Sequence, residues 1–179
     1  MASSRRRWGW HQLQPAWADR LVAAADLRPG ALVLDIGAGH GVLTGSLLDA
    51  GMRVIAVELH PARAETLRGR FGDRVTVVRA DAADLRLPTR SFHVVANPPF
   101  GVSSPLLRRL VSPGSRLRSA HIIVPTAVAA RWAGASAPAA RRWQPRWHPQ
   151  VAMRIPRSAF SPRPRVDSAV LRLQRRGVR

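Results

Sequence analysis

The chain of 179 residues has no cysteine, no lysine and only ten acidic residues. Without cysteine there is no disulfide framework, zinc ribbon or thiol nucleophile, and we expect no metal site. No apolar run is long enough to span a membrane, and the basic start at 1–11 lacks the apolar stretch of a signal peptide. We therefore expect one compact cytoplasmic domain that does not contact a membrane.

Every one of the 29 basic residues is an arginine, which gives a formal net charge of +19 and a pI of about 12.0. A GC-rich genome explains arginine in place of lysine, but it explains the shortage of acids less well. A surface this positive repels itself unless it meets a polyanion, and arginine binds phosphate and stacks on bases. The charge favours nucleic acid as the partner over a basic protein with no specific ligand.

Apolar runs alternate with helical patterns along most of the chain. This alternation predicts a mainly parallel sheet covered on both faces, with ligands at the carboxyl ends of its strands. We expect a basic, aromatic arm at 1–14, a folded domain at 15–179, and an Arg/Trp-rich loop or insert at 133–150. The expected strands are 31–35, 53–57, 75–79, 92–96, 120–124, 151–155 and 168–173, and the expected helices are 15–27, 42–50, 61–71, 105–110 and 126–132.

A glycine-rich turn with Gly37, Gly39 and Gly41 follows the first of these strands. Such a turn lets the backbone approach a ligand, but dinucleotide-binding folds use nearly the same turn. The carboxylate of Asp35, just before the turn, suits the cationic amino-acid end of S-adenosylmethionine better than a pyrophosphate. Further along, Glu58 can accept both ribose hydroxyl protons and Asp81 can accept from the adenine amine of that cofactor. The alternative is that these acids are solvated strand ends.

The tetrapeptide 97–100 reads Asn-Pro-Pro-Phe and directly follows an expected strand. An exocyclic amine on an aromatic base is a poor nucleophile, and acceptors that bond its hydrogens draw it toward tetrahedral geometry. The Asn97 side-chain oxygen and the Pro98 carbonyl can be those acceptors, and Phe100 offers a ring for stacking. No strong general base is needed, so catalysis is orientation and electrostatics, and the target base must be flipped or unpaired. The alternative is a plain tight turn.

These motifs, in this order and spacing, resemble the ribosomal RNA adenine N6-dimethyltransferases of the Erm and KsgA types. The late run 155–171, with its pattern F-x-P-x-P-x-V-D-S-A-V, is similar to that family's own signature. The resemblance implies a Rossmann-like class I S-adenosylmethionine-dependent methyltransferase fold with a mainly parallel seven-stranded sheet. It also implies that Ala82 contacts the cofactor beside Asp81, and that Phe160 covers the face of the target base opposite Phe100.

Three features depart from the family pattern. His11 stands where the family has an asparagine in Gln-Asn-Phe-Leu, while Leu13 is kept, and the resemblance implies that both touch the cofactor. Pro125 replaces the family's usual glutamine ahead of the mid-chain helix. The usual helical C-terminal domain is expected to be lacking, which makes the chain most similar to the short Erm enzymes of mycobacteria.

Two segments rich in arginine and tryptophan can hold RNA in place of that domain, because arginine neutralises phosphates and tryptophan stacks on unpaired bases. The alternative is that the tryptophans pack on the domain. The residues of this hypothesis are Arg5, Arg6, Arg7, Trp8, Trp10, Arg141, Arg142, Trp143, Arg146 and Trp147.

The sequence therefore predicts a monomeric S-adenosylmethionine-dependent enzyme that methylates an adenine of 23S ribosomal RNA, protein-free or in an early assembly particle. The expected phenotype is macrolide-lincosamide-streptogramin resistance. Two alternatives are a KsgA-type small-subunit dimethyltransferase and an RNA-binding factor with dispensable methyl transfer. An NAD-dependent enzyme would leave residues 97–100 without a role.

Overall fold

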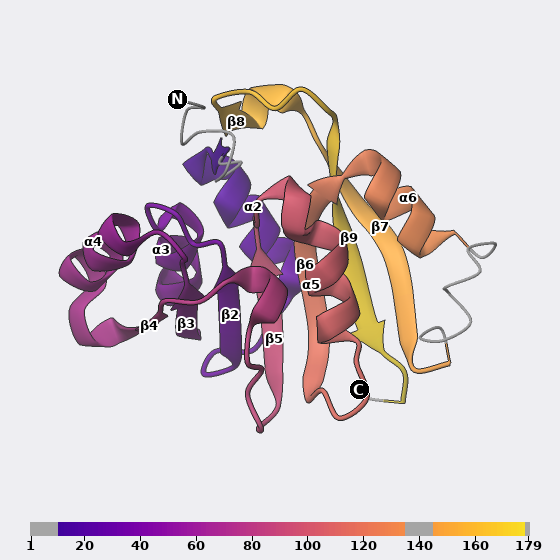
Figure 1. Cartoon of the computed structure of the whole chain (residues 1–179), viewed down its shortest axis with the longest axis horizontal. Helices are drawn as coiled ribbons and strands as arrows, with labels where there is room; N and C mark the ends of the chain where they lie inside the picture. The colour runs from indigo at the N-terminus through magenta and orange to yellow at the C-terminus, as the bar shows by residue number, and fades with distance from the viewer. Residues whose placement is uncertain (1–10, 135–144, 178–179) are drawn as a thin grey trace.

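The computed structural model describes residues 11–134 and 145–177, which form an α/β domain with helices on both faces of one sheet (Figure 1). The seven strands of that sheet follow the order β4-β3-β2-β5-β6-β9-β7. Strands β4, β3, β2, β5 and β6 pair in parallel, whereas β9 is antiparallel to both β6 and β7. The prediction of a mainly parallel sheet covered on both faces is confirmed.

The bounds of the strands and helices follow the predicted alternation closely. The strands are β1 Gln12–Leu13, β2 Leu32–Ile36, β3 Arg53–Val57, β4 Val75–Val78, β5 Phe92–Ala96, β6 Leu117–Pro125, β7 Trp147–Ile155, β8 Phe160–Ser161 and β9 Ser168–Arg175. The α-helices are α2 Pro15–Ala25, α3 Val42–Asp49, α4 Pro61–Phe71, α5 Ser103–Leu110 and α6 Thr126–Ala133. Short 3-10 turns include η2 Ala82–Asp84 and η3 Phe100–Val102.

Two layers of apolar side chains hold the helices to the sheet. All five residues of β2 are buried, as expected for a central strand covered on both faces. On one face Phe92 and Leu34 pack with α5 and α6, and on the other Val95 and Val33 pack with α2 and α3. Alternate residues of one strand thus feed both layers, so the loops at the strand ends are held by a core on each side.

The structure corrects the predicted insert at 133–150. Strand β7 begins at Trp147, so four of those residues belong to the sheet, where they pair with β9. Residues 135–144 lie outside the described part of the chain. The β1–β8 pair was also not predicted, since a two-residue strand has no periodicity to read. It joins Leu13 to Phe160 across 147 positions of sequence and makes residues 12–13 part of the folded body.

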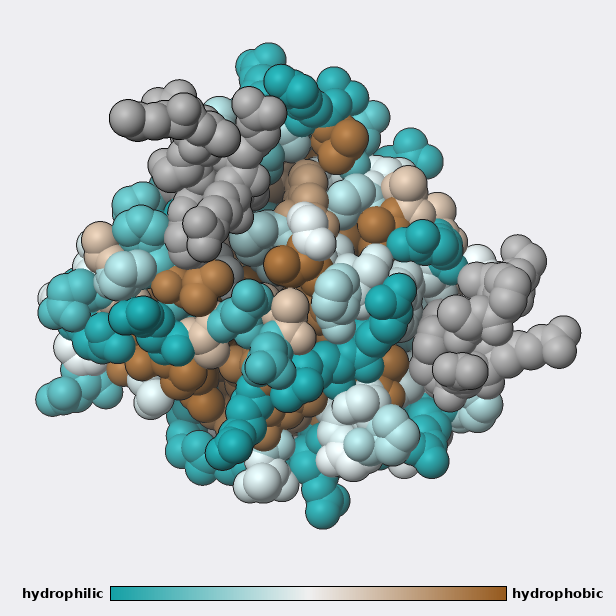
Figure 2. Space-filling model, viewed as in Figure 1, coloured by the Kyte–Doolittle hydropathy of each residue, from teal (hydrophilic) through white to brown (hydrophobic). Residues whose placement is uncertain are grey.

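The surface seen in Figure 2 is hydrophilic over α5 and the loops beyond it, with apolar residues showing between the elements. Among the described residues, no helix combines the length and the apolar character that crossing a membrane requires.

Candidate active site

Residues from four adjacent strands meet at the carboxyl edge of the sheet. A pocket there is lined by Gly37 after β2, Glu58 after β3, Asp81 after β4 and Asn97 after β5. The strand order β4-β3-β2-β5 therefore sets these groups in a row, over three strand spacings or roughly 14 Å. A smaller adjoining pocket is lined by Asp35, His11, Leu13 and Asn97 among others. Asn97 belongs to both pockets and so marks the point where they join.

Asp35, the fourth residue of β2, is 1 % exposed. Its Oδ2 accepts a 2.6 Å hydrogen bond from the hydroxyl of Thr44. Burial raises the pKa of the Asp35 carboxyl to about 7, the Thr44 bond opposes that rise, and the nearby charge of Glu58 adds to it. A cation delivered to this pocket would stabilise the ionised carboxyl, which fits the predicted contact with the amino-acid end of S-adenosylmethionine.

Glu58 is 4 % exposed and is held in place by two backbone amides. Gly39 N–H donates to Oε2 at 2.9 Å, and His60 N–H donates to Oε1 at 2.8 Å. The guanidinium of Arg63 lies 3.2 Å from Oε1. These contacts orient the carboxylate. Oε2 has one donor and keeps a lone pair with which to accept a ribose hydroxyl proton, whereas Oε1 faces both His60 N–H and the Arg63 guanidinium.

The three glycines of the turn have different tasks. Gly37 has φ +79° and lines both pockets, and a Cβ built there would stand 3.0 Å from the Pro98 Cα. Gly39 and Gly41 line neither pocket: Gly39 binds Glu58, and a Cβ on Gly41 would stand 2.6 Å from the ring of Phe71. Of these three glycines only Gly37 lines either pocket, and cofactor binding by the turn stays a prediction.

Asp81 and Ala82 begin the 3-10 turn η2 at the outer end of the pocket. The Asp81 Oδ1 accepts a 2.8 Å hydrogen bond from the N–H of Ala83. This bond fixes the carboxylate and leaves Oδ2 available to an adenine amine.

Asn97 is oriented by the backbone of the N-terminal segment. Its Nδ2 donates a 2.9 Å hydrogen bond to the carbonyl of His11. A carbonyl can only accept, so the amide nitrogen must face it, and Oδ1 is directed away from it. The next residue, Pro98, is buried and packs closely against Gly37. Two acceptor oxygens, Asn97 Oδ1 and the Pro98 carbonyl, are thus held on a stiff segment at the pocket.

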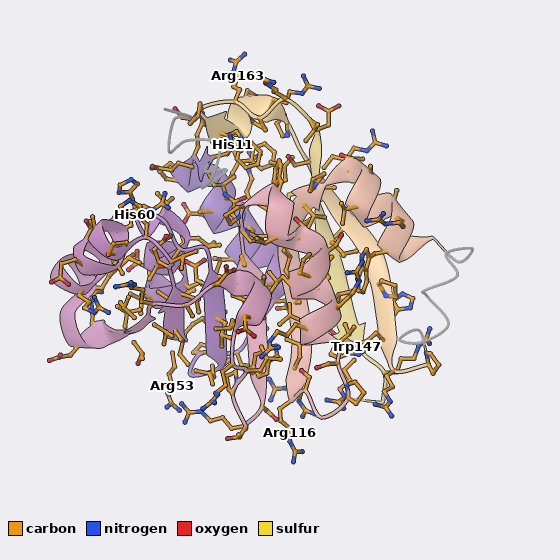
Figure 3. All side chains as sticks on the ribbon, in the orientation of Figure 1. His11, Arg53, His60, Arg116, Trp147 and Arg163 are labelled. Atoms are coloured by element: carbon orange, nitrogen blue, oxygen red, sulfur yellow. The ribbon has the colours of Figure 1, made fainter. Side chains whose placement is uncertain are left out.

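His11 lies between the pocket and the late run 155–171. Figure 3 shows it below Arg163, which belongs to that run. The His11 Nδ1 lies 2.9 Å from the Pro162 carbonyl, so Nδ1 carries the proton and donates. The His11 ring also lies 5.7 Å from that of Phe100, centroid to centroid. Leu13 is 3 % exposed and pairs with Phe160 across β1 and β8. His11 and Leu13 both line the smaller pocket, and their contact with the cofactor stays a prediction.

The two phenylalanines predicted to enclose the target base are not equivalent. Phe100 is half-buried and lines the main pocket. Phe160 is 2 % exposed and packs within the core layer under α2. In this structure Phe160 does not line the main pocket, and stacking of the target base on it stays a prediction.

The predicted RNA-binding segments are only partly described. Arg5 to Arg7, Trp8, Trp10, Arg141, Arg142 and Trp143 lie outside the described residues, while Arg146 is exposed. Trp147 is 2 % exposed in the core, with the guanidinium of Arg175 5.8 Å from its ring centroid. A buried indole cannot stack on RNA, so Trp147 is removed from the hypothesis.

Sequence reasoning missed several residues of the main pocket. Arg63 is the most informative, since it contributes a cation beside Glu58. Its position was readable: it lies in the first turn of α4, directly beyond the strand that ends before Glu58. Val57, Leu59, Ala80, Pro99 and Val102 complete the missed lining. In the described part of the chain, no group of three or more His, Asp or Glu side chains is placed to hold a metal ion.

The strand order, the glycine turn after β2 and the acids after β3 and β4 define a Rossmann-like class I S-adenosylmethionine-dependent methyltransferase fold. The chain belongs to the family described as ribosomal RNA adenine dimethylase, which it matches over residues 2–179.

Individual relatives of both predicted types are similar to the chain. It is 36 % identical over 167 residues to the ribosomal RNA small subunit methyltransferase A of Cupriavidus metallidurans, covering 86 % of this chain and 59 % of the relative. It is 37 % identical over 150 residues to the mycinamicin-resistance protein MyrB of Micromonospora griseorubida, covering 82 % and 47 %. The chain thus spans about half to three fifths of the length of these relatives.

The fold is also similar to that of a solved structure. The crystal structure of the 23S rRNA methyltransferase ErmE superposes with a TM-score of 0.84 at 27 % identity, covering 92 % of this chain and 70 % of that one.

Proposed function

We propose that this protein transfers a methyl group from S-adenosylmethionine to the exocyclic N6 amine of an adenine in ribosomal RNA. The observation that carries the proposal is the position of Asn97. Its amide nitrogen is used by the His11 carbonyl, so its oxygen is left for the substrate, at the junction of the two pockets. Membership of the ribosomal RNA adenine dimethylase family supports the same reaction.

The residues present fit S-adenosylmethionine along its length. Asp35 would hold the ammonium, Glu58 the ribose hydroxyls, and Asp81 with Ala82 the adenine. Burial raises the pKa of the Asp35 carboxyl to about 7, and the ammonium of a bound cofactor would stabilise its ionised form. When bound, S-adenosylmethionine supplies an electrophilic methyl group bonded to a positively charged sulfur.

The chain's own residues then act on the amine of the target base. Asn97 Oδ1 and the Pro98 carbonyl each accept a hydrogen bond from the amine. These two bonds direct the nitrogen lone pair toward the methyl group that is transferred. Phe100, beside them in the pocket, stacks on the base and excludes water from one face. After transfer the amine is acidic, so its proton leaves without a dedicated base.

Within this reaction we propose large-subunit RNA as the substrate and macrolide-type resistance as the phenotype. The likeness to a structure described as a 23S rRNA methyltransferase and to a mycinamicin-resistance protein supports this choice. The second candidate is small-subunit RNA, which the relatives named ribosomal RNA small subunit methyltransferase A favour.

The test is transfer of labelled methyl to protein-free large- and small-subunit RNA and to assembling particles, with the modified adenine mapped by primer extension. A stop at one large-subunit adenine supports the proposal in full. Label on small-subunit RNA alone would replace the finer proposal by the second candidate. No label on any RNA, with the cofactor bound, would overturn the proposed reaction.

A further inference from the structure

The arginines and acids are unevenly divided along the chain. Residues 85–179 contain 18 of the 29 arginines but only one acid, Asp167, whereas residues 1–84 contain eleven arginines and nine acids. In the fold, the second part builds β5, α5, β6, α6, β7 and β9, which together make one side of the molecule (Figure 1). Among the described residues, most of the excess positive charge therefore belongs to the part of the chain that builds these elements and the β8 segment, and not to residues 11–84.

That side carries a groove distinct from the active-site pocket. It runs between α5, the loop before β5 and the loop after α5, and has a volume of about 730 Å³. Three of its lining side chains are arginines, Arg108, Arg109 and Arg116, alongside hydroxyl-bearing Thr89, Ser112 and Ser115. Figure 2 shows hydrophilic residues mixed with apolar ones on the face that it draws. Leu87, Pro88, Pro105 and Pro113 also line the groove, so its lining is mixed, but its guanidinium groups suit phosphate oxygens.

The three arginines of the groove differ in whether their guanidinium groups have an acidic or carbonyl partner within the protein. Arg109 is tied down, since its Nε donates to the Leu85 carbonyl and its Nη1 lies 3.7 Å from Asp84. Arg108 and Arg116 are exposed and have no ion pair within the described residues 11–134 and 145–177. Two unneutralised cations in one hollow repel each other, which an arriving polyanion would relieve.

Two elements lie between the groove and the active-site pocket. One is the turn η2, in which Ala82 lines the pocket and Ala83 lines the groove. Strand β5 spans the same distance: Asn97 follows its carboxyl end, and the Arg116 carbonyl accepts from Phe92 N–H at its other end. Five strand residues cover roughly 17 Å, so one strand of RNA can occupy both places.

We propose that this groove binds the phosphate backbone of the substrate RNA on one side of the target adenine, through Arg108 and Arg116. The inference rests on the proposed function, because it takes the adenine in the pocket and the phosphates in the groove to belong to one RNA. The groove adds a contact site on the described part of the fold to those expected of the Arg/Trp-rich segments.

The test compares the double variant R108Q/R116Q with R28Q/R53Q, which removes the same charge from exposed positions in the acid-containing half. Affinity for a large-subunit rRNA fragment is measured at several salt concentrations. Loss of two phosphate contacts makes the slope of log K against log salt shallower by about 1.4 to 1.8. We expect that change in R108Q/R116Q only, with a raised KM for RNA, an unchanged kcat and an unchanged thermal unfolding midpoint.

Equal slopes in the two double variants would overturn the groove assignment, whatever the wild-type protein does. Methyl transfer by the wild-type protein is assayed on the same RNA. The proposed reaction and the proposed groove are therefore tested by different measurements. Transfer with equal slopes leaves the proposed function standing and removes the groove. A shallower slope in R108Q/R116Q without any transfer keeps an RNA-binding groove and removes the reaction.

Discussion

The side-chain amide of Asn97 donates a 2.9 Å hydrogen bond to the backbone carbonyl of His11, joining the catalytic loop to a residue 86 positions earlier. Because the acceptor is a backbone atom, replacing the His11 side chain leaves it in place. The bond directs the amide nitrogen of Asn97 toward His11 and its oxygen away, and the oxygen is the atom that the proposed chemistry requires.

Asn97→Ala should therefore lower methyl transfer by at least 100-fold, comparable to the loss of one preorganised polar contact in other enzymes. Asp35 and Glu58 are untouched, so affinity for S-adenosylmethionine should fall by less than tenfold. The measurements are single-turnover methyl transfer to rRNA and calorimetric titration with the cofactor. Wild-type resistance in cells carrying Asn97→Ala, with the modification lost, would favour the RNA-binding factor with dispensable methyl transfer, whereas wild-type modification would contradict the role of Asn97.

Gly37→Ala should damage the same loop through backbone geometry alone. The new Cβ would stand 3.0 Å from the Pro98 Cα at a φ of +79°, so the loop must shift or the protein must carry strain of about 1–3 kcal/mol. We expect a lower unfolding midpoint and at least a tenfold loss of methyl transfer.

Gly69→Ala is the matched control, because Gly69 lies within helix α4 and an added Cβ there meets nothing within 4 Å. This change should stabilise the protein by about 0.5–1 kcal/mol without altering activity. Equal effects of the two substitutions on transfer would contradict the close approach of Gly37 to the catalytic loop.

Asp35 should make both stability and cofactor binding depend on pH. Its pKa is about 7 in the folded protein and 3.8 for the unperturbed group, so between those values the folded state holds a proton that the unfolded state has lost. Stability contributed by this group therefore falls as pH rises from about 4 to 7 and stays low above 7. Binding of a cationic ligand needs the ionised carboxyl, so affinity for S-adenosylmethionine should rise over the same window.

Calorimetry across pH 5 to 8 checks this behaviour, and two variants separate its causes. Asp35→Asn should bind the cofactor weakly and without the pH dependence. Thr44→Val removes the hydroxyl that stabilises the ionised form, so the rise in affinity should move to higher pH. A pH dependence that survives in Asp35→Asn would assign the titration to another group.

Phe100→Ala and Phe160→Ala should fail in different ways. Phe100 lines the pocket and is half-buried, so its loss should raise the KM for RNA and lower kcat with little change in unfolding. Phe160 is a core residue, and its truncation should cost about 3–5 kcal/mol of stability. Chemical denaturation and steady-state kinetics on both variants decide the matter, and a stable Phe160→Ala protein with a specific defect in RNA turnover would support Phe160 as the second stacking ring.

Local pattern in the sequence was enough for the order of strands and helices, for the glycine turn, and for Asp35, Glu58, Asp81 and Asn97. These features are readable because each acid or amide directly follows a strand, and parallel strands end at one edge of a sheet. The family signature in 155–171 was equally visible, since it is a contiguous string.

Only the tertiary structure decided the roles of residues whose partners are distant in sequence. The burial of Phe160 depends on its pairing with Leu13, and that of Trp147 on the registration of β7 with β9. The orientation of Asn97 depends on the carbonyl of His11, and the groove of Arg108 and Arg116 depends on α5 lying beside the loop before β5. Composition and periodicity describe a residue and its near neighbours, whereas burial and hydrogen-bond partners are set by which segments pack together.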